Sequence, residues 1–251
     1  MASKFYAIVI GAGTGTGSAA ARRFAKSYPV VLMARSPASY QDAVDAINAS
    51  GGQAVGVSAD AADEGSLKAA FARVRDELLP GHKLAAAVYN VGANFKRAPF
   101  LEATVADLDW SLGGNVRGTF LFAQQTIPLL LETAAAAAAR PPHPPTLILT
   151  GATASLRGAA HCAGFAAGMA ARRALGQSLA REFGPRGVHV AHAVVDGVID
   201  IPRTSGYNVN GGAEDGKLDP DAIAESYWHL HTQPRSAFTQ ELDLRPYVEK
   251  F

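Results

Sequence analysis

Cysteine is almost absent from the sequence, and neither sign of charge is in excess. The 251 residues include one cysteine, Cys162, so a disulfide within the chain is excluded. Lys and Arg number 23 against 22 Asp and Glu, a formal net charge of +1. Such a balance disfavours nucleic acid or an anionic membrane as the partner. We therefore expect a small-molecule substrate.

Long apolar runs are missing too, because Gly, Pro or a charged residue interrupts each of them before the roughly 18 residues that a membrane helix needs. The first residues run directly into a strand-like segment, without a secretory hydrophobic stretch. A cytoplasmic protein is the expectation. The composition, 48% hydrophobic and 18% charged, is typical of a globular chain, and we expect one domain over residues 1–251.

Short apolar and β-branched runs recur along the chain, and stretches of helical periodicity separate them. The predicted strands cover residues 6–10, 30–33, 54–57, 84–89, 147–149 and 188–195. Strands that are apolar on both faces and alternate with helices are typical of a parallel sheet covered on both sides. The predicted fold class is α/β, with a doubly wound parallel sheet.

The segments between these strands carry helix signals. Glycines open a helix just before Ser18, and Asp63 with Glu64 begins a helical stretch that runs to Leu79. Residues 104–131 are periodic enough for one long helix. Residues 134–145, an alanine run followed by prolines, predict an exposed loop.

The most informative segment is the glycine-rich turn between the first strand and the first helix. Its glycines have the spacing Gly11-xxx-Gly15-x-Gly17, with Thr14 and Thr16 between them. Glycines at such a turn let the backbone approach a phosphate, and the helix N-terminus adds free N–H groups. The turn is either such an anion cradle or a tight packing of helix on sheet.

The end of the second predicted strand carries Arg35 and Ser36. An NAD-binding protein usually has an acid there, about 20 residues beyond the glycines, for the ribose hydroxyls. An arginine beside a serine suits a 2′-phosphate, so the cofactor NADP(H) is favoured over NAD(H). The alternative is a solvated surface arginine.

The glycine spacing resembles that of the short-chain dehydrogenase/reductase superfamily, and the resemblance covers nearly the whole chain. Asp60-Ala61 matches the family's adenine-contacting position, and Tyr89-Asn90-Val91-Gly92 resembles its Asn-Asn-Ala-Gly turn. Asn115 stands where the family has the asparagine of its catalytic tetrad, and Ile199 where backbone meets the nicotinamide carboxamide. The resemblance implies a Rossmann-like fold and an oxidoreductase that acts on a carbonyl or alcohol.

The other three tetrad positions differ from the family. Ala152, Phe165 and Met169 occupy the positions of the family's Ser, Tyr and Lys. Phenylalanine cannot give a proton and methionine carries no charge, so the usual acid is lost. The chain resembles an atypical branch that has Phe in place of the Tyr, and it departs from that branch at Met169. The family also implies a homodimer or homotetramer, built through the helices that carry Asn115 and Phe165.

Several residues near the lost tetrad could take over the acid. Thr153 and Ser155 offer hydroxyls, but such residues more often form a turn or cap. His161 is of a residue type that often acts as a general acid, but a lone histidine here is more often exposed or bonded to backbone. Arg172 and Arg173 could restore some positive charge, although surface or subunit-contact arginines are the simpler interpretation. Tyr89, which ends a buried strand, is expected in the core.

Three functions remain open from the sequence. The first is an NADP(H)-dependent oxidoreductase with a relocated acid. The second is a catalytically inactive NADP(H)-binding pseudoenzyme, and the third is a non-redox lyase or cyclase that reuses the pocket. Residues 202–218, rich in Gly and Asn, predict a mobile lid over the substrate. The sequence contains no metal-ligand spacing such as C-x-x-C or H-E-x-x-H, and no metal is expected.

Overall fold

Seven parallel strands form one sheet in the computed structural model of the protein, which describes residues 4–92, 95–136 and 141–250. The strand order is β3-β2-β1-β4-β5-β6-β7. The strands are β1 (Phe5–Ile10), β2 (Val30–Ala34), β3 (Ala54–Ser58), β4 (Lys83–Tyr89), β5 (Thr146–Thr150), β6 (His189–Val195) and β7 (Glu241–Leu244). The predicted fold class, a single-domain doubly wound α/β sheet, is confirmed.

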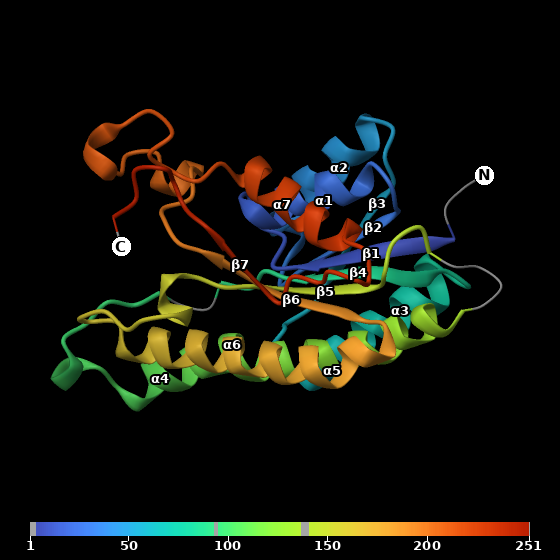
Figure 1. Cartoon of the computed structure of the whole chain (residues 1–251), viewed down its shortest axis with the longest axis horizontal. Helices are drawn as coiled ribbons and strands as arrows, with labels where there is room; N and C mark the ends of the chain where they lie inside the picture. The colour runs from blue at the N-terminus through green and yellow to red at the C-terminus, as the bar shows by residue number, and fades with distance from the viewer. Residues whose placement is uncertain (1–3, 93–94, 137–140, 251) are drawn as a thin grey trace.

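Helices cover both faces of the sheet, as Figure 1 shows. α1 (Thr16–Ala25), α2 (Gln41–Ala49) and α7 (Pro220–Thr232) lie on one face. α3 (Glu64–Arg73), α4 (Val105–Leu112), α5 (Gly118–Ala135) and α6 (Ala163–Phe183) lie on the other. Each face buries its own apolar cluster, the first around Phe24 and Tyr227 and the second around Phe71 and Phe122. Among the described residues, no helix is long and apolar enough to cross a membrane.

All six predicted strands are present, and one strand was missed. β7 pairs with β6 at the edge of the sheet. It has only four residues, two of them acidic, so it lacks the apolar run that identifies the buried strands. The acidic side chains are accommodated because an edge strand is only partly buried.

The predicted helix over residues 104–131 is interrupted by a π-helical turn, η4 (Gly113–Arg117), between α4 and α5. It begins as expected, because Thr104 and Asp107 form a capping box. The extra residue in a π turn rotates the chain locally, and such turns are frequent at functional sites. Asn115 lies in this turn and is fully buried.

The alanine- and proline-rich segment differs from the predicted exposed loop at its start. α5 continues to Ala135, because alanine is the strongest helix former. Residues 137–140 of the predicted loop lie outside the described residues. Residues 141–145 form no helix before β5 begins, as the prolines require.

A buried histidine joins α7 to the sheet and makes stability depend on pH. His231 lies between the Tyr28 hydroxyl and the Thr146 Oγ1, each 3.0 Å from a ring nitrogen. Burial, with smaller contributions from His143 and His189, lowers the pKa of His231 to about 3. The unfolded chain therefore binds a proton that the folded chain does not between pH 6.5 and 3.

This histidine predicts a loss of stability in acid. Acidification from pH 7 to pH 5 is expected to lower the free energy of unfolding by about 2 kcal/mol through His231 alone, at about 1.4 kcal/mol per pH unit. Denaturant unfolding at both pH values measures the change. His231→Gln replaces the imidazole with a polar amide that does not titrate, so the unfolding free energy of this variant should depend less on pH. An unchanged pH slope in this variant would contradict the assignment.

Candidate active site

Two adjoining cavities lie at the carboxyl ends of the central strands. In doubly wound sheets the ligand crevice is where the strand order reverses, here between β1 and β4. The cavities measure about 390 Å³ and 440 Å³. Both are lined by the same residues of the glycine turn and of the segment after β4: Gly11, Gly13, Asn90, Val91 and Gly92. Together they form an elongated site with two ends.

The glycine turn packs against the end of β4 and leaves one side open. Gly11 has a φ of +83°, and a Cβ there would lie 2.5 Å from the Asn90 carbonyl carbon. A Cβ on Gly17 would lie 2.2 Å from the Gly11 oxygen. Gly13 instead faces open space, with nothing within 4 Å of a Cβ. The anion cradle and the tight packing of helix on sheet are thus compatible, since Gly11 and Gly17 allow close packing and Gly13 leaves room beside the cavity.

The start of α1 faces this cavity without a side-chain cap. Gly15, at the N-cap, offers no side-chain hydrogen bond to the first turn. The Thr16 hydroxyl is buried and has no hydrogen-bond partner among the described residues. Asn90 holds the turn through its Nδ2, which donates to the Gly11 oxygen at 3.1 Å. Thr14 and Thr16 line the cavity. The uncapped first turn therefore has N–H groups, a free hydroxyl and the positive end of the helix dipole available for an anion.

One end of the site suits a nucleotide. Arg35, Asp60, Ala61 and the exposed indole of Trp110 line it. The Asp60 Oδ1 accepts a hydrogen bond from the Ala62 N–H at 2.9 Å, which fixes the turn after β3. Ser36 is not among the lining residues of this cavity, where the nearby Ser39 is found.

The other end of the site is largely apolar. Its walls include Ala152, Phe165 and Met169, the residues at the predicted tetrad positions. Ile199 and Ile201, which follow β6, also line it. No phenol, imidazole or thiol is among the lining residues described for this end. A substrate carbonyl there would meet no conventional proton donor.

Arg172 lies beneath this apolar end and is almost completely buried. Its Nη1 donates to the Thr150 carbonyl at 2.8 Å, and its Nη2 donates to the Val91 carbonyl at 2.9 Å. The same Nη2 donates to the Asn115 Oδ1 at 2.8 Å, and Nε donates to the Asn115 carbonyl at 3.3 Å. The interpretation as a surface arginine was wrong for Arg172, because acceptors from three segments of the chain satisfy its donors inside the core.

The buried guanidinium gives the site a fixed positive charge. Burial lowers the pKa of Arg172, while Tyr89 and Tyr227 raise it, and an arginine remains protonated in proteins. Its central carbon lies 4.9 Å from the centre of the Tyr89 ring. Tyr89 is itself a core residue, as expected, and its hydroxyl donates to the Gly114 carbonyl at 2.6 Å. Arg172 therefore supplies, three residues further along α6, a charge that Met169 lacks.

Comparison with known proteins identifies the family. The short chain dehydrogenase model matches residues 6–208. The chain belongs to the short-chain dehydrogenase family. It is 31% identical over 131 residues to the uncharacterized oxidoreductase YxbG of Bacillus subtilis, covering 52% of this chain and about half, 47%, of that protein.

Solved structures agree over nearly the full length. A short-chain dehydrogenase from Rhodopseudomonas palustris is 32% identical, with a TM-score of 0.77, covering 97% of this chain and 99% of that one. An alcohol dehydrogenase from Thermococcus sibiricus, complexed with 5-hydroxy-NADP, has a TM-score of 0.80 at 21% identity, covering 98% and 97% of the two chains. The second likeness establishes the shared fold only.

The three residues predicted to replace the family's acid lie outside the apolar end. The Thr153 hydroxyl donates to the buried carboxylate of Asp196. The Ser155 Oγ accepts from the Ala152 N–H at 3.2 Å, as a turn residue does. His161 lines a separate cavity beside α4. A catalytic role for these three residues stays a prediction. Their positions outside the apolar end do not favour it.

Arg173 is not a free surface arginine either, because it is bonded to the edge strand β7. Its guanidinium donates to both oxygens of Glu241 on β7, at 2.6 and 2.8 Å. The same carboxylate lies 3.2 Å from the Nδ1 of the buried His192. Arg173 is therefore a partly buried link between α6 and β7.

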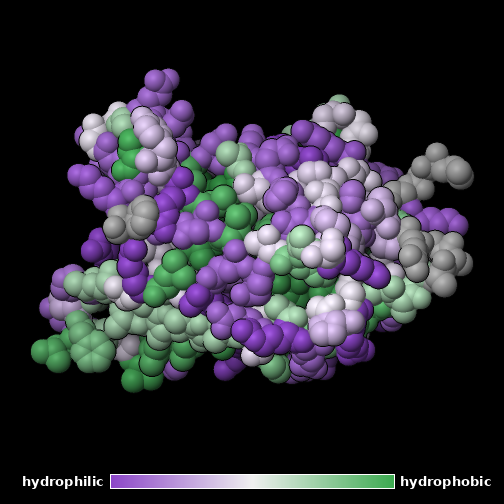
Figure 2. Space-filling view, in the orientation of Figure 1, coloured by the Kyte–Doolittle hydropathy of each residue, from purple (hydrophilic) through white to green (hydrophobic). Residues whose placement is uncertain are grey.

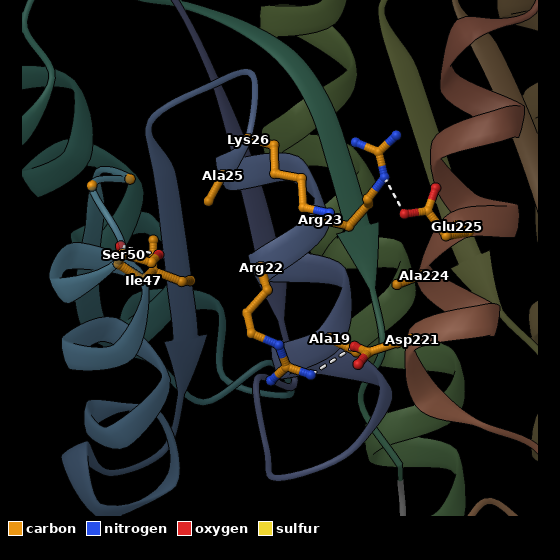
Figure 3. A pocket seen from close by; sticks show the side chains of 12 residues that line it. Ala19, Arg22, Arg23, Ala25, Lys26, Ile47, Ser50, Asp221, Ala224 and Glu225 are labelled. Atoms are coloured by element: carbon orange, nitrogen blue, oxygen red, sulfur yellow. Dashed lines mark hydrogen bonds and ion pairs between the residues drawn. The ribbon is translucent and has the colours of Figure 1, made fainter.

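Another cavity, of about 590 Å³, lies among α1, α7 and the end of α2, away from the glycine turn (Figure 3). Its arginines are already paired, since Arg22 reaches Asp221 at 2.7 Å and Arg23 reaches Glu225 at 2.6 Å. These carboxylates would repel an anion. The described residues also contain no group of three His, Cys, Asp or Glu side chains that could hold a metal ion. The crevice beside the glycine turn is therefore the best candidate for a functional site.

Sequence reasoning missed two residues of this site. Trp110 lines the nucleotide end from α4, and Arg203 lines the cavity near the glycine turn. Arg172 was named as a possible source of positive charge, because it lies seven residues after Phe165 and thus near the same helical face, but its burial beneath the apolar end was not predicted. Trp110 and Arg203 carried no signal in the sequence, since only the fold brings α4 and the segment after β6 to the crevice.

Proposed function

We propose that the protein is an NADP(H)-binding oxidoreductase that acts on a small carbonyl or alcohol substrate through an atypical active site. The observation that carries the proposal is the elongated crevice, with an uncapped helix start and an open glycine at its middle. Arg35 lines one end, and an apolar wall of suitable size for a nicotinamide and a small substrate lines the other.

The residues of the crevice fit the cofactor. The turn from Gly11 to Gly17, with Thr14 and Thr16, would hold the pyrophosphate. Asp60, Ala61, Asn90 and Gly92 would contact the adenosine half, and the Ile199 backbone the carboxamide. The cofactor would supply the hydride. Ala152, Phe165 and Met169 would exclude water around the substrate, and Arg172 would hold Asn115 and the ends of β4 and β5 in position.

Arg35 would select the phosphorylated cofactor. It stands at the end of β2 and lines the nucleotide end, and the described residues include no ion-pair partner for it. Arg35→Ala is expected to weaken NADPH binding about tenfold or more, because a charge-assisted contact to the 2′-phosphate is lost, and to leave NADH binding unchanged. Titration by nicotinamide fluorescence measures both affinities.

A matched control is available on α1. Arg22→Ala removes an exposed arginine that is paired with Asp221, outside the crevice, and should change neither affinity. Equal binding of NADPH and NADH by the unaltered protein would refute the role of Arg35. If the unaltered protein binds neither NADPH nor NADH, the proposed function is refuted.

A catalytically inactive cofactor-binding protein is the second candidate, favoured by the absence of a proton donor among the described residues of the apolar end. Purified protein with NADPH and a broad panel of aldehydes and ketones separates the two. Steady NADPH oxidation that disappears in Arg35→Ala at limiting cofactor supports the oxidoreductase. Tight NADPH binding with no oxidation supports the inactive protein. Substrate turnover without any change in nicotinamide absorbance would instead indicate the non-redox alternative.

A homodimer or homotetramer is part of the proposal. Apolar side chains are exposed before and along α4, with Phe100 at 75%, Leu101 at 97% and Val105 at 74% exposure. Figure 2 shows hydrophobic surface over this part of the molecule. Exposed apolar patches of this kind are typical of subunit interfaces, and α4 lies against α6.

A further inference from the structure

The glycine turn lacks any charged side chain. From Gly11 to Gly17 it contains only Gly, Ala and Thr. A pyrophosphate carries two negative charges, and backbone N–H groups with a helix dipole supply only partial positive charge. A cation close to the turn would therefore strengthen the binding of a dinucleotide.

Three arginines line the two cavities, and two of them are poorly placed to contact the glycine turn. Arg172 donates its hydrogen bonds to backbone carbonyls and to Asn115. Arg35 lines the nucleotide cavity, which Thr14 and Gly15 do not line. Arg203 lines the cavity that Thr14, Gly15 and Thr16 also line. Among the described residues it has no ion-pair partner, and its side chain is exposed.

The segment around Arg203 is held against the glycine turn. Arg203 lies in a short 3-10 turn, η7 (Pro202–Thr204), directly after Ile201. A Cβ on Gly15 would lie 3.0 Å from the Ile201 Cγ2, so these two residues are in contact. On one side, therefore, the position of Arg203 beside the turn is set by the packing of Ile201, two residues before it.

Hydrogen bonds fix the other side of the same segment. The Thr204 hydroxyl is buried, donates to the Ile199 carbonyl and accepts from the Ile201 N–H at 3.2 Å. Lys217 Nζ donates to the Thr204 carbonyl at 2.8 Å and to the Ser205 carbonyl at 3.1 Å. Lys217 also lies 3.6 Å from Asp200, so its charge is shared. Arg203 itself has no ion-pair partner among the described residues, and hydrogen bonds hold the backbone that carries it.

We propose that Arg203 binds the pyrophosphate of the dinucleotide, from the segment after β6 and across from the glycine turn. This inference rests on the proposed function. An arginine presents several N–H donors in a plane that matches phosphate oxygens, so the contact is bidentate and charge-assisted. Ile201, which has no hydrogen-bonding side chain, packs on Gly15 and leaves the phosphate contact to Arg203.

The two arginines of the crevice then differ in a measurable way. NADPH and NADH share the pyrophosphate, whereas only NADPH carries the 2′-phosphate. Loss of Arg203 must weaken both cofactors by a similar factor, while loss of Arg35 weakens NADPH alone. Adenosine 2′-monophosphate, which has a 2′-phosphate and no pyrophosphate, should respond to Arg35 and not to Arg203.

The test is a matched set of titrations of the full chain with NADPH, NADH and adenosine 2′-monophosphate. Arg203→Gln is expected to raise both dinucleotide dissociation constants about tenfold, and Arg203→Lys to raise them less. The salt dependence of dinucleotide binding should also decrease in Arg203→Gln, because one charge contact is removed. Arg35→Gln serves as the control. Since Arg203 is exposed, its variants should keep the circular dichroism and melting temperature of the unaltered protein.

The outcomes separate this inference from the proposed function. Unchanged dinucleotide affinities in Arg203→Gln would overturn the role of Arg203 and leave the proposed function standing. A loss confined to NADPH would also overturn it, because Arg203 would then contact the 2′-phosphate. If the unaltered protein binds neither dinucleotide, the proposed function and this inference both fail.

Discussion

Replacement of Arg172 with methionine is expected to lower the free energy of unfolding by about 3 kcal/mol or more. The Thr150 and Val91 carbonyls and the Asn115 Oδ1 would lose their donor inside the protein. A buried acceptor left without a partner costs about 1 to 3 kcal/mol. Methionine keeps helix propensity and a similar length, so the loss reports the hydrogen bonds and not the helix. Urea unfolding measures the change.

Arg173 provides the adjacent control. It is also an arginine on α6, but it is partly exposed and pairs with one carboxylate, Glu241. Arg173→Met should therefore cost about 1 kcal/mol or less. Equal urea midpoints for Arg172→Met and the unaltered protein would show that water replaces the guanidinium at these carbonyls. Arg172 would then not be what holds Asn115 and the ends of β4 and β5 in position.

Arg172→Lys tests whether charge alone is sufficient. A lysine carries the same charge, but its single nitrogen cannot reach the acceptors on β5, on η4 and in the segment after β4 together. We expect most of the stability loss to persist in this variant. A lysine variant as stable as the unaltered protein would mean that the charge, and not the planar set of donors, is what the core requires.

Phe165→Tyr is expected to raise the rate of NADPH oxidation with small carbonyl compounds by about 100-fold or more. Phe165 lines the apolar end of the crevice beside Ala152 and Met169, so a phenol there would face the substrate. Arg172, two helical turns further along the same face, would favour the ionised phenol and thus lower its pKa. Steady-state kinetics with saturating NADPH measures the gain.

Phe95 supplies a matched control for this change. Its ring contacts the Phe165 ring, with centroids 5.2 Å apart, but it is not among the residues that line the crevice. Phe95→Tyr adds the same hydroxyl nearby and should leave the rate unchanged. If Phe165→Tyr binds NADPH normally and shows no gain, proton donation at this position is not what limits turnover.

The architecture was largely predictable because buried parallel strands are apolar on both faces. Six strands and the crossing helices followed from that pattern. β7 escaped because an edge strand can be short and acidic, and the π turn at Asn115 escaped because hydrophobic periodicity does not register one extra residue in a long helix. The residues of the glycine turn were also identifiable, since their spacing within one short segment needs no tertiary information.

The sequence by itself determined the doubly wound fold, the glycine turn, Arg35 directly after β2, and Ala152, Phe165 and Met169 at the predicted tetrad positions. These features are local, or are read from positions in one segment. Only the tertiary structure decided what surrounds them. It buried Arg172 against carbonyls from three separate elements, turned Thr153 toward Asp196, and brought Arg203 to the glycine turn. The reason is physical: contacts between segments far apart in the chain depend on how the layers pack, and no local pattern encodes them.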